Sequence, residues 1–555
     1  MRTGGELLVS HLAREGVRHV FTVPGESFIA ALDAMHAEPG VRPITCRNES
    51  GAAMMAEATG KLTGRPGVAL VTRGPGAANA LAGVYIAQQD ASPMILLVGL
   101  ADSTVAGRPA FQDIDIAAVF GSVAKWCAVV PSAAHIGAYL SRAFCAALSG
   151  RSGPVVLGLP ESVLSDFAQA GSIQTVRVDR PAPTAEKLAH IRVALAHAER
   201  PIVIVGGPEW SADASRDLAV FAERFDLPVA ASFRRQDHFD NRHRCYAGHA
   251  GLNIDAALAA GIRSSDCVIA LGTRLGDVTT QGYTLLQANS ATQKIIHIVP
   301  DAGRSDASYP HALPVPASAI TAAAALARLD LPGKRPPWGI WRRDLRQAYE
   351  ATVKPLPTPG RVRLEEAILI LSQMLPDDAI ICSGAGNYAA FLHRYFTYKS
   401  YPSQLAPVSG SMGYGLPAAV AAKLAHPNRP VVALAGDGCF QMTGQDLATA
   451  VQFALPLVLI IANNGSLGTI RMHQERLYPG HIVATSLVNP DFVTLAQSYG
   501  AAAERVEATA AFAPALQRAL AANGPAVIEL ATDIEAISPT ETITGLRAQT
   551  QNSSG

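Results

Sequence analysis

Short apolar runs without polar alternation recur along the chain, and most of them end in a turn rich in Gly or Asn. They are Val68–Val71, Met94–Val98, Val155–Leu159, Ile202–Val205, Cys267–Leu271, Lys294–Val299, Val431–Ala435, Leu457–Ile461 and Ala526–Leu530. Runs of this kind are typical of parallel strands buried on both faces. Because Ala-rich helical stretches separate them, each third of the chain predicts a doubly wound parallel sheet of the α/β class.

Proline-rich segments divide this pattern. Arg180–Thr184 separates the first third from the second, and Gly333–Trp338 and Lys354–Gly360 bracket a helix that leads into the last third. Proline disfavours helix at these points and indicates extended connectors. For a chain of 555 residues this predicts three α/β domains, at 1–165, 185–335 and 360–535, followed by a polar tail at 536–555.

Charge, cysteine content and apolar run length bear on partners and compartment. Lys+Arg and Asp+Glu both number 45. The chain therefore lacks the surplus of basic residues that is typical of nucleic-acid-binding proteins. The seven cysteines are scattered and contain no CxxC pair, which favours buried reduced thiols. Residues 1–16 predict an amphipathic helix rather than a signal peptide, and the run Leu455–Ala462 is too short to span a membrane. We expect a cytoplasmic protein without a membrane partner.

The most informative chemistry lies in the last third. Gly436-Asp437-Gly438 and Asn463-Asn464 each follow an apolar run, with room between them for a helix over Thr443–Phe453 and a return strand. A crossover of this kind brings both turns to one sheet edge. A carboxylate, an amide oxygen and a backbone carbonyl are ligands that Mg²⁺ prefers when it also binds phosphate. The alternative is that GDG is only a turn and NN only a helix cap.

GDG followed at this distance by NN resembles the signature of thiamine-diphosphate-dependent enzymes. The resemblance implies that Asp437, Asn464 and the backbone carbonyl of Ser466 hold a Mg²⁺ that anchors the cofactor's diphosphate, and it places Asn387 against the diphosphate. Further positions that it assigns to cofactor binding are Gly74, Asn79, Gly386, Gly410, Met412, Gly436, Gly438, Cys439, Leu467 and Gly468.

Thiamine chemistry also needs an acid that hydrogen-bonds the aminopyrimidine ring and promotes its imino tautomer. Glu49 follows the predicted strand Arg42–Cys46 and precedes a helix of small and apolar residues. By itself it is equally well explained as an acid favoured at a helix N-terminus. The segment RNESGAAMMAEA resembles the family pattern RHExGAxxMAxG, which assigns the activating role to Glu49 and leaves Glu57 to packing or capping.

Met412 lies in Ser409-Gly-Ser-Met-Gly-Tyr-Gly, which resembles the segment beneath the middle of the cofactor in the family. By that resemblance Met412 forces the two cofactor rings into a V shape, and the Gly410 carbonyl accepts from the amino group. An ordinary core methionine is the alternative.

Nearly the whole chain resembles the acetolactate synthase large-subunit group. Gly74–Asn79 matches its GPGxxN loop, and Ala110–Asp115 followed by Lys125 matches a segment that approaches substrate. Gln112 is therefore a candidate donor to an oxo-acid carboxylate, and Lys125 a candidate to offset its charge; a solvated lysine explains Lys125 nearly as well. The resemblance implies a transferase that decarboxylates a 2-oxo acid and ligates the product to a second carbonyl. A decarboxylase or lyase that releases an aldehyde is the alternative, and a catalytically silent scaffold is a third.

Further features of the sequence bear on the substrate, on a second cofactor and on the assembly. Glu26 stands where many acetolactate synthases have a small residue, and if its loop lines the pocket, as in relatives, it would disfavour an anionic or purely apolar acceptor. The segment Leu467–Glu475 also departs from the group. Gly206-Gly207 and Gly272-Thr273-Arg274 resemble a flavin-holding segment, so FAD is a possible second cofactor. The resemblance further implies a homodimer or homotetramer with the active site at the subunit interface, whereas donor, acceptor and any regulatory subunit stay undetermined.

Overall fold

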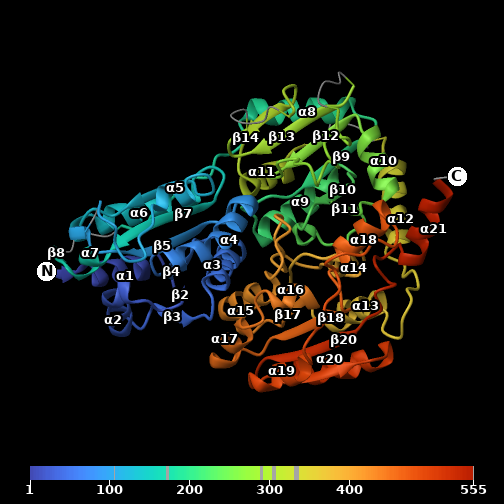
Figure 1. The fold of residues 1–555 in the computed structure, drawn as a ribbon. Coiled ribbons are helices and arrows are strands. Elements are labelled where there is room, and N and C mark those ends of the chain that lie inside the picture. Colours follow the sequence, from blue (N-terminus) through green and yellow to red (C-terminus); the bar gives the residue numbers. More distant parts are fainter. Residues whose placement is uncertain (106, 170–173, 288–291, 303–307, 331–336, 554–555) are drawn as a thin grey trace. The chain divides into compact units, whose positions relative to one another are not determined.

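The computed structural model describes residues 1–105, 107–169, 174–287, 292–302, 308–330 and 337–553 (Figure 1). The chain divides into two compact units. Unit 1 comprises 1–179, 407–427 and 443–455, and unit 2 comprises 180–406, 428–442 and 456–555.

Unit 1 contains a six-stranded parallel sheet in the order β3-β2-β4-β5-β7-β6. Its strands are β2 (His19–Thr22), β3 (Arg42–Thr45), β4 (Gly67–Val71), β5 (Met94–Leu100), β6 (Trp126–Val129) and β7 (Pro154–Pro160). Every residue of β4, β5 and β7 is buried, which confirms the interpretation of their unalternating apolar runs. β1 (Arg2–Thr3) and β8 (Phe167–Ala168) form a short antiparallel pair.

The helices of unit 1 include two from the last third of the sequence, α15 and α17. They are α1 (Gly4–Arg14), α2 (Ile29–Ala37), α3 (Glu49–Thr63), α4 (Gly74–Asp90), α5 (Ile116–Phe120), α6 (Ile136–Leu148), α7 (Glu161–Ser165), α15 (Gly415–Ala425) and α17 (Asp446–Gln452). Helix α3 packs against both α4 and α15. The Asn48 side chain caps the N-terminus of α3 by accepting a hydrogen bond from the Ser50 N–H. Gly64, at φ 67°, ends the helix.

Unit 2 contains two further six-stranded parallel sheets. The first has the order β11-β10-β9-β12-β13-β14, and the second has the order β16-β15-β17-β18-β20-β19. The strands of the first are β9 (Pro201–Val205), β10 (Val229–Ser232), β11 (Tyr246–Ala250), β12 (Cys267–Leu271), β13 (Lys294–Val299) and β14 (Leu313–Pro316). Those of the second are β15 (Ile380–Ser383), β16 (Gln404–Leu405), β17 (Val431–Gly436), β18 (Val458–Asn463), β19 (Ala502–Val506) and β20 (Ala526–Ala531). The molecule therefore has the three predicted α/β sheets.

The helices of unit 2 lie before, between and after these strands in the sequence. They are α8 (Ala185–His197), α9 (Ala212–Arg224), α10 (Ala256–Ser264), α11 (Ala319–Ala327), α12 (Gly339–Thr352), α13 (Leu364–Met374), α14 (Asn387–Tyr395), α16 (Asp437–Gln441), α18 (Gly468–Leu477), α19 (Phe492–Ser498), α20 (Phe512–Leu520) and α21 (Ile543–Ser553). The helix predicted between the proline-rich segments is α12. Because β15, β17 and β18 are neighbours, the turns that follow them lie at one edge of the sheet.

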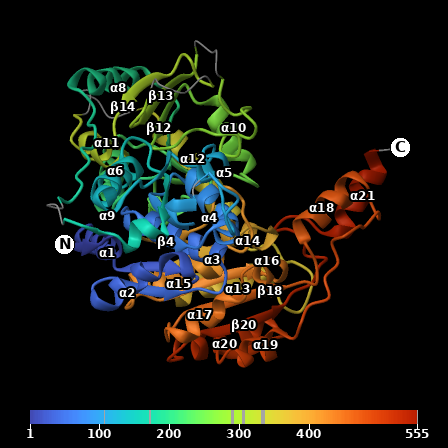
Figure 2. The ribbon, with the colours of Figure 1, turned by 60° about the vertical axis from the view of Figure 1, so that its left-hand side comes forward.

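Two elements differ from the sequence-based predictions. The helix predicted over Thr443–Phe453 begins only at Asp446, because the residues before it form a turn at Gly444. The predicted polar tail contains α21, which lies beside α18 (Figures 1 and 2). There Ile543 and Leu546 are buried with Met472, so this apolar contact orders the segment.

All seven cysteines are free, five of them buried, but Cys145 is exposed. Of the predicted connector Gly333–Trp338, residues 333–336 lie outside the described part of the chain, as does the predicted boundary at 335. Within the described part, every helix is too short or too polar to cross a lipid bilayer.

Candidate active site

The predicted site residues fall in both units. In unit 1 are Glu49, Gly74, Asn79, Gln112, Lys125, Gly410 and Met412, and in unit 2 are Gly386, Asn387, Gly436, Asp437, Gly438, Cys439, Asn464, Ser466, Leu467 and Gly468.

Asp437, at the end of β17, is 2% exposed and its carboxylate is held by several donors. One oxygen accepts from the Gly438 N–H at 2.9 Å, and the other accepts from the Ser466 N–H at 3.2 Å. Burial raises the pKa of Asp437, and these hydrogen bonds oppose that rise. The Asn464 side-chain oxygen also accepts from the Ser466 N–H, at 3.1 Å. The fold thus brings the three predicted metal ligands together.

This oxygen set fits Mg²⁺. The Ser466 carbonyl accepts from the Gly468 N–H at 2.9 Å and keeps a second lone pair for a cation. Among the described residues no group of three or more His, Cys, Asp and Glu side chains is placed to hold a metal. The Asp437 set offers one carboxylate and two neutral oxygens, a composition suited to a Mg²⁺ that also binds phosphate.

Asn387 is the first residue of α14, and both the nitrogen and the oxygen of its side-chain amide form hydrogen bonds. Its nitrogen donates to the Ile537 carbonyl at 2.7 Å, and its oxygen accepts from the Thr469 hydroxyl at 2.9 Å. It therefore connects α14 to the start of α18, where Leu467 and Gly468 lie.

Gly386 and Gly436 both pack against the ring of Tyr388. A Cβ at Gly386 would lie 2.7 Å from that ring, and one at Gly436 would lie 3.0 Å from it. The Tyr388 hydroxyl lies 3.2 Å from the Cys439 sulfur. Packing on Tyr388 is thus a reason for both glycines that does not involve a ligand.

Two residues that belong to no sequence motif, Asn489 and Glu529, hold the candidate metal-site loop, residues 463–466. The Asn489 side chain donates to Asp437 at 2.8 Å and to Asn463 at 2.9 Å. Asn463 in turn donates to the buried Glu529 at 2.8 Å. Asn489 lies in a loop far from GDG in the sequence. The only signal for this network in the sequence was the Asn463-Asn464 dipeptide.

Glu49 opens α3, as predicted, and is 8% exposed. One carboxylate oxygen accepts from the Asn79 side chain at 2.9 Å. The other lies against Gly76, where an added Cβ would be 3.2 Å away. The GPGxxN loop and the candidate acid therefore meet directly, and Asn79 orients Glu49.

Gln112 and Lys125 differ in how they relate to this cluster. The Gln112 carbonyl accepts from the Gly74 N–H at 2.8 Å, which places this residue beside the start of α4. The Lys125 ammonium instead donates to the Ser149 carbonyl at 2.7 Å, at the end of α6. Lys125 is exposed, which agrees with the alternative of a solvated lysine, and its role toward substrate stays a prediction.

Gly410 and Met412 lie in the turns that lead to α15. Gly410 has φ 71°, a conformation suited to glycine, and Met412 is partly exposed. Nearby, the fully buried Glu57 accepts from the Tyr414 hydroxyl at 2.5 Å and from Ser92 at 2.6 Å, and burial raises its pKa. Glu57 therefore has the packing role expected for it.

Glu26 is paired with a cation. Its carboxylate accepts from Arg73 at 3.1 Å, and the same guanidinium donates to Glu161 at 3.0 Å. Because Arg73 is shared between two carboxylates, it offsets the charge of Glu26 only in part.

The glycines of the predicted flavin segment are explained by backbone packing. A Cβ on Gly207 would lie 1.8 Å from the Gly272 carbonyl oxygen, and one on Gly206 would lie 1.8 Å from the Ser232 hydroxyl. These close approaches require glycine whether or not a flavin binds, so they lend FAD no separate support.

Comparisons with known proteins agree with this arrangement. Family profiles match as "Thiamine pyrophosphate enzyme, N-terminal TPP binding domain" over residues 2–119, its "central domain" over 188–326 and its "C-terminal TPP binding domain" over 384–530. The chain is 31% identical to the acetolactate synthase large subunit of Haemophilus influenzae, covering 90% of this chain and 88% of that protein. It is 30% identical to the large subunit of Corynebacterium glutamicum (95% and 86%) and to the isozyme 3 large subunit of Escherichia coli (90% and 89%). The chain therefore belongs to the thiamine pyrophosphate enzymes, in the family that includes the large subunits of acetolactate synthase.

Proposed function

We propose that this protein is a carboligase that decarboxylates a 2-oxo acid and joins the resulting fragment to a second carbonyl, as its relatives' name, acetolactate synthase, implies for them. The observation that carries the proposal is the convergence of Asp437 and Asn464 on the Ser466 N–H at the carboxyl ends of adjacent strands. It supports a Mg²⁺ site at the edge where the family binds diphosphate.

The chain's own residues then have distinct tasks. Asp437, Asn464 and the Ser466 carbonyl would hold Mg²⁺, and Asn387 would bind the diphosphate. Glu49, oriented by Asn79, would hydrogen-bond the aminopyrimidine and hold a proton there. When bound, thiamine diphosphate supplies a ring that accepts the electron pair released on decarboxylation. Gln112, next to the Gly74 loop, is the candidate donor to the substrate carboxylate.

Product analysis tests this proposal. The purified protein is incubated with thiamine diphosphate, Mg²⁺ and pyruvate, and acetolactate and acetaldehyde are quantified separately. Acetolactate as the main product supports ligation. Acetaldehyde alone supports the alternative decarboxylase, and the absence of both products indicates that pyruvate is not the donor.

The proposal extends to the assembly and the cellular location of the protein. A homodimer or homotetramer would place Glu49 of one chain opposite Asp437 of another, following the arrangement implied by the resemblance. A cytoplasmic location agrees with seven free cysteines. FAD is a possible second cofactor, and the packing of Gly206 and Gly207 gives it no separate support. A flavin band in the visible spectrum of the purified protein tests this directly.

A further inference from the structure

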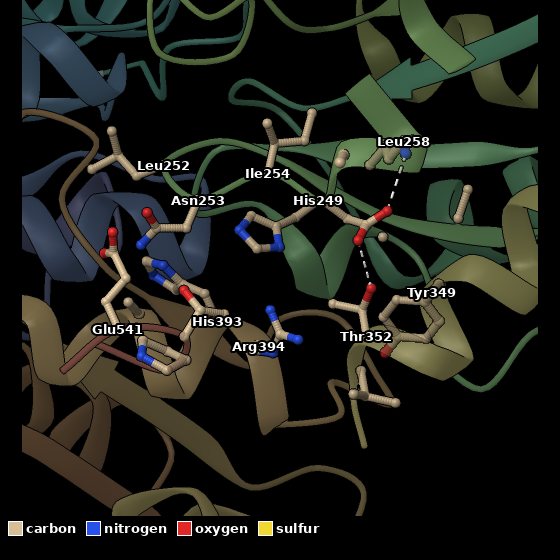
Figure 3. Close-up of a pocket in the computed structure, with 18 of the residues that line it drawn as sticks. His249, Leu252, Asn253, Ile254, Leu258, Tyr349, Thr352, His393, Arg394 and Glu541 are labelled. Atoms are coloured by element: carbon tan, nitrogen blue, oxygen red, sulfur yellow. Dashed lines mark hydrogen bonds between the residues drawn. The ribbon is translucent and has the colours of Figure 1, made fainter. Parts of the chain in front are cut away.

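Unit 2 contains a cavity of about 460 Å³ that uses none of the predicted cofactor residues (Figure 3). Its walls come from β11 and the loop after it, from α10 and α12, from the second half of α14, and from Arg476 with residues 539–541. This volume lies within the range of small-molecule sites.

Polar groups without partners line this cavity. His393 is 5% exposed, and its Nε2 has no hydrogen-bond partner among the described residues. The same holds for Nε2 of His249, whose ring centre lies 5.7 Å from that of His393. Burial lowers the pKa of His249 to about 4 and lowers the pKa of His393 well below its usual value, so both rings are neutral near pH 7. Each neutral ring can donate or accept one hydrogen bond here.

The cavity also has a positive charge without a counter-ion. Arg394 forms no ion pair within the described part of the chain, and its buried Nε lacks a partner. By contrast, Arg476 is paired with Glu541. Asp255 keeps its charge, but among the described residues it forms no ion pair with Arg394 and accepts instead from the Leu258 N–H at 3.2 Å and the Thr352 hydroxyl at 2.8 Å (Figure 3). Arg394 is therefore the cationic group of this wall that can receive an anion.

The remaining wall is largely apolar. Leu252, Ile254 and Leu258 line one part of the cavity, with Tyr349 and Val353 from α12. Side chains of this kind bury the body of an organic ligand while a few polar groups fix its orientation.

We propose that this cavity is a second ligand site, which binds a small organic acid with one carboxylate, a hydroxyl or keto oxygen next to it, and an apolar body. Arg394 binds the carboxylate, the two neutral histidines bind the neighbouring oxygen, and the leucine and isoleucine wall covers the apolar body.

The site is separate from the candidate active site but connected to it by a rigid helix. Helix α14 begins at Asn387, and His393 lies six residues further on, about 9 Å along the axis. Helix α18 likewise begins beside the metal-site loop and reaches the cavity at Arg476. The proposal concerns binding alone and stands whether or not the proposed reaction is correct.

Calorimetric titration of the protein loaded with thiamine diphosphate and Mg²⁺ tests the proposal. The probe is 2-hydroxy-4-methylpentanoate, and its controls are the corresponding uncharged amide and 4-methylpentanoate, which lacks the hydroxyl. We expect the acid to bind, the amide to bind at least tenfold more weakly, and the compound without the hydroxyl to bind more weakly than the acid. Arg394→Gln should weaken binding of the acid at least tenfold. Arg518→Gln, at an exposed arginine outside the cavity, should leave it unchanged.

Two further variants separate this site from others. Leu252 is 55% exposed and lines the cavity, so Leu252→Trp should block it without loss of folding, even if Arg394→Gln fails to fold. Glu49→Gln should bind the acid as the unaltered protein does. Absence of binding, or binding that Leu252→Trp leaves unchanged, overturns the proposal.

Discussion

Asn489 shows how a single amide outside any motif can position a candidate metal ligand. Its side chain bonds both Asp437 and Asn463, so it holds the carboxylate and the asparagine loop in one arrangement. Residues that orient metal ligands in this way affect metal affinity even though they do not touch the ion.

We predict that Asn489→Ala weakens Mg²⁺-dependent binding of thiamine diphosphate by about 10–100-fold, because Asp437 loses a donor that fixes its orientation. Titration of the cofactor against intrinsic fluorescence at varied Mg²⁺ measures this. Asn428→Ala, at an exposed residue of the same unit, serves as control. Equal cofactor affinity in both variants would show that Asn489 has no part in the metal site.

At the scale of elements, the contact between α3 and α4 sets the distance between Glu49 and Asn79. A Cβ on Gly83 of α4 would lie 2.4 Å from the Ala53 side chain and 2.6 Å from its backbone. Gly83 lies one turn after Asn79, and Ala53 lies one turn after Glu49. The helices can approach this closely only because Gly83 has no side chain.

Gly83→Ala should therefore lower the free energy of unfolding by about 1–3 kcal/mol, the usual cost of overpacking, and should reduce turnover by displacing Asn79 from Glu49. Gly137→Ala is the matched control, since the space around that helical glycine is open and alanine there is expected to gain about 0.5–1 kcal/mol. Urea unfolding midpoints compare the two. If both variants have the same stability, the close contact is not limiting.

Helix α21 is tied to α18 by a buried carboxylate. The two oxygens of Glu475 accept from Arg547 at 2.7 and 2.8 Å, and Arg471 donates to it as well. Hydrogen bonds from Arg547 lower the pKa of Glu475 from 4.5 to about 2. Since the docked carboxylate stays charged where the free one takes a proton, this stabilisation is complete above pH 4.5 and is lost as the pH falls toward 2.

At neutral pH, Glu475→Gln should reduce the docking free energy of α21 by about 2 kcal/mol, because hydrogen bonds to a charged group are replaced by weaker ones. Hydrogen–deuterium exchange over residues 543–549 measures docking. Glu366→Gln, which removes an exposed ion pair with Arg363, should change it little. In the unaltered protein the same exchange, corrected for its intrinsic pH dependence, should accelerate below pH 4.5.

At the scale of the molecule, the sequence was sufficient for the three sheets because their inner strands are apolar on both faces. It also located Asp437 and Asn464, since each follows such a strand directly. The sequence could not locate Asn489 or Glu529, because tertiary contacts determine their partners. It also did not predict that α21 is a docked helix, because this docking depends on three apolar side chains in an otherwise polar segment. The ion pair between Glu26 and Arg73 was likewise invisible without coordinates.

The proposed assembly predicts complementation between two inactive variants. If Glu49 of one chain serves the metal site of another, a mixed dimer of Glu49→Gln and Asp437→Ala contains one intact site and one doubly altered site. Random reassociation of equal amounts should then restore about a quarter of the original turnover. No recovery, with mixed dimers confirmed by mass spectrometry, would place both residues in one chain's site.

The central claim is that Glu49 activates a bound thiamine diphosphate, and it can be tested without knowing the substrate. The measurement is the rate at which the C2 hydrogen of the bound cofactor exchanges with deuterium, followed by acid quench and NMR, in the unaltered protein and in Glu49→Gln. We predict rapid exchange in the former and exchange slowed at least 100-fold in the latter, with the cofactor bound in both. Equal exchange rates with the cofactor bound would contradict the assignment of Glu49 and the mechanism that depends on it.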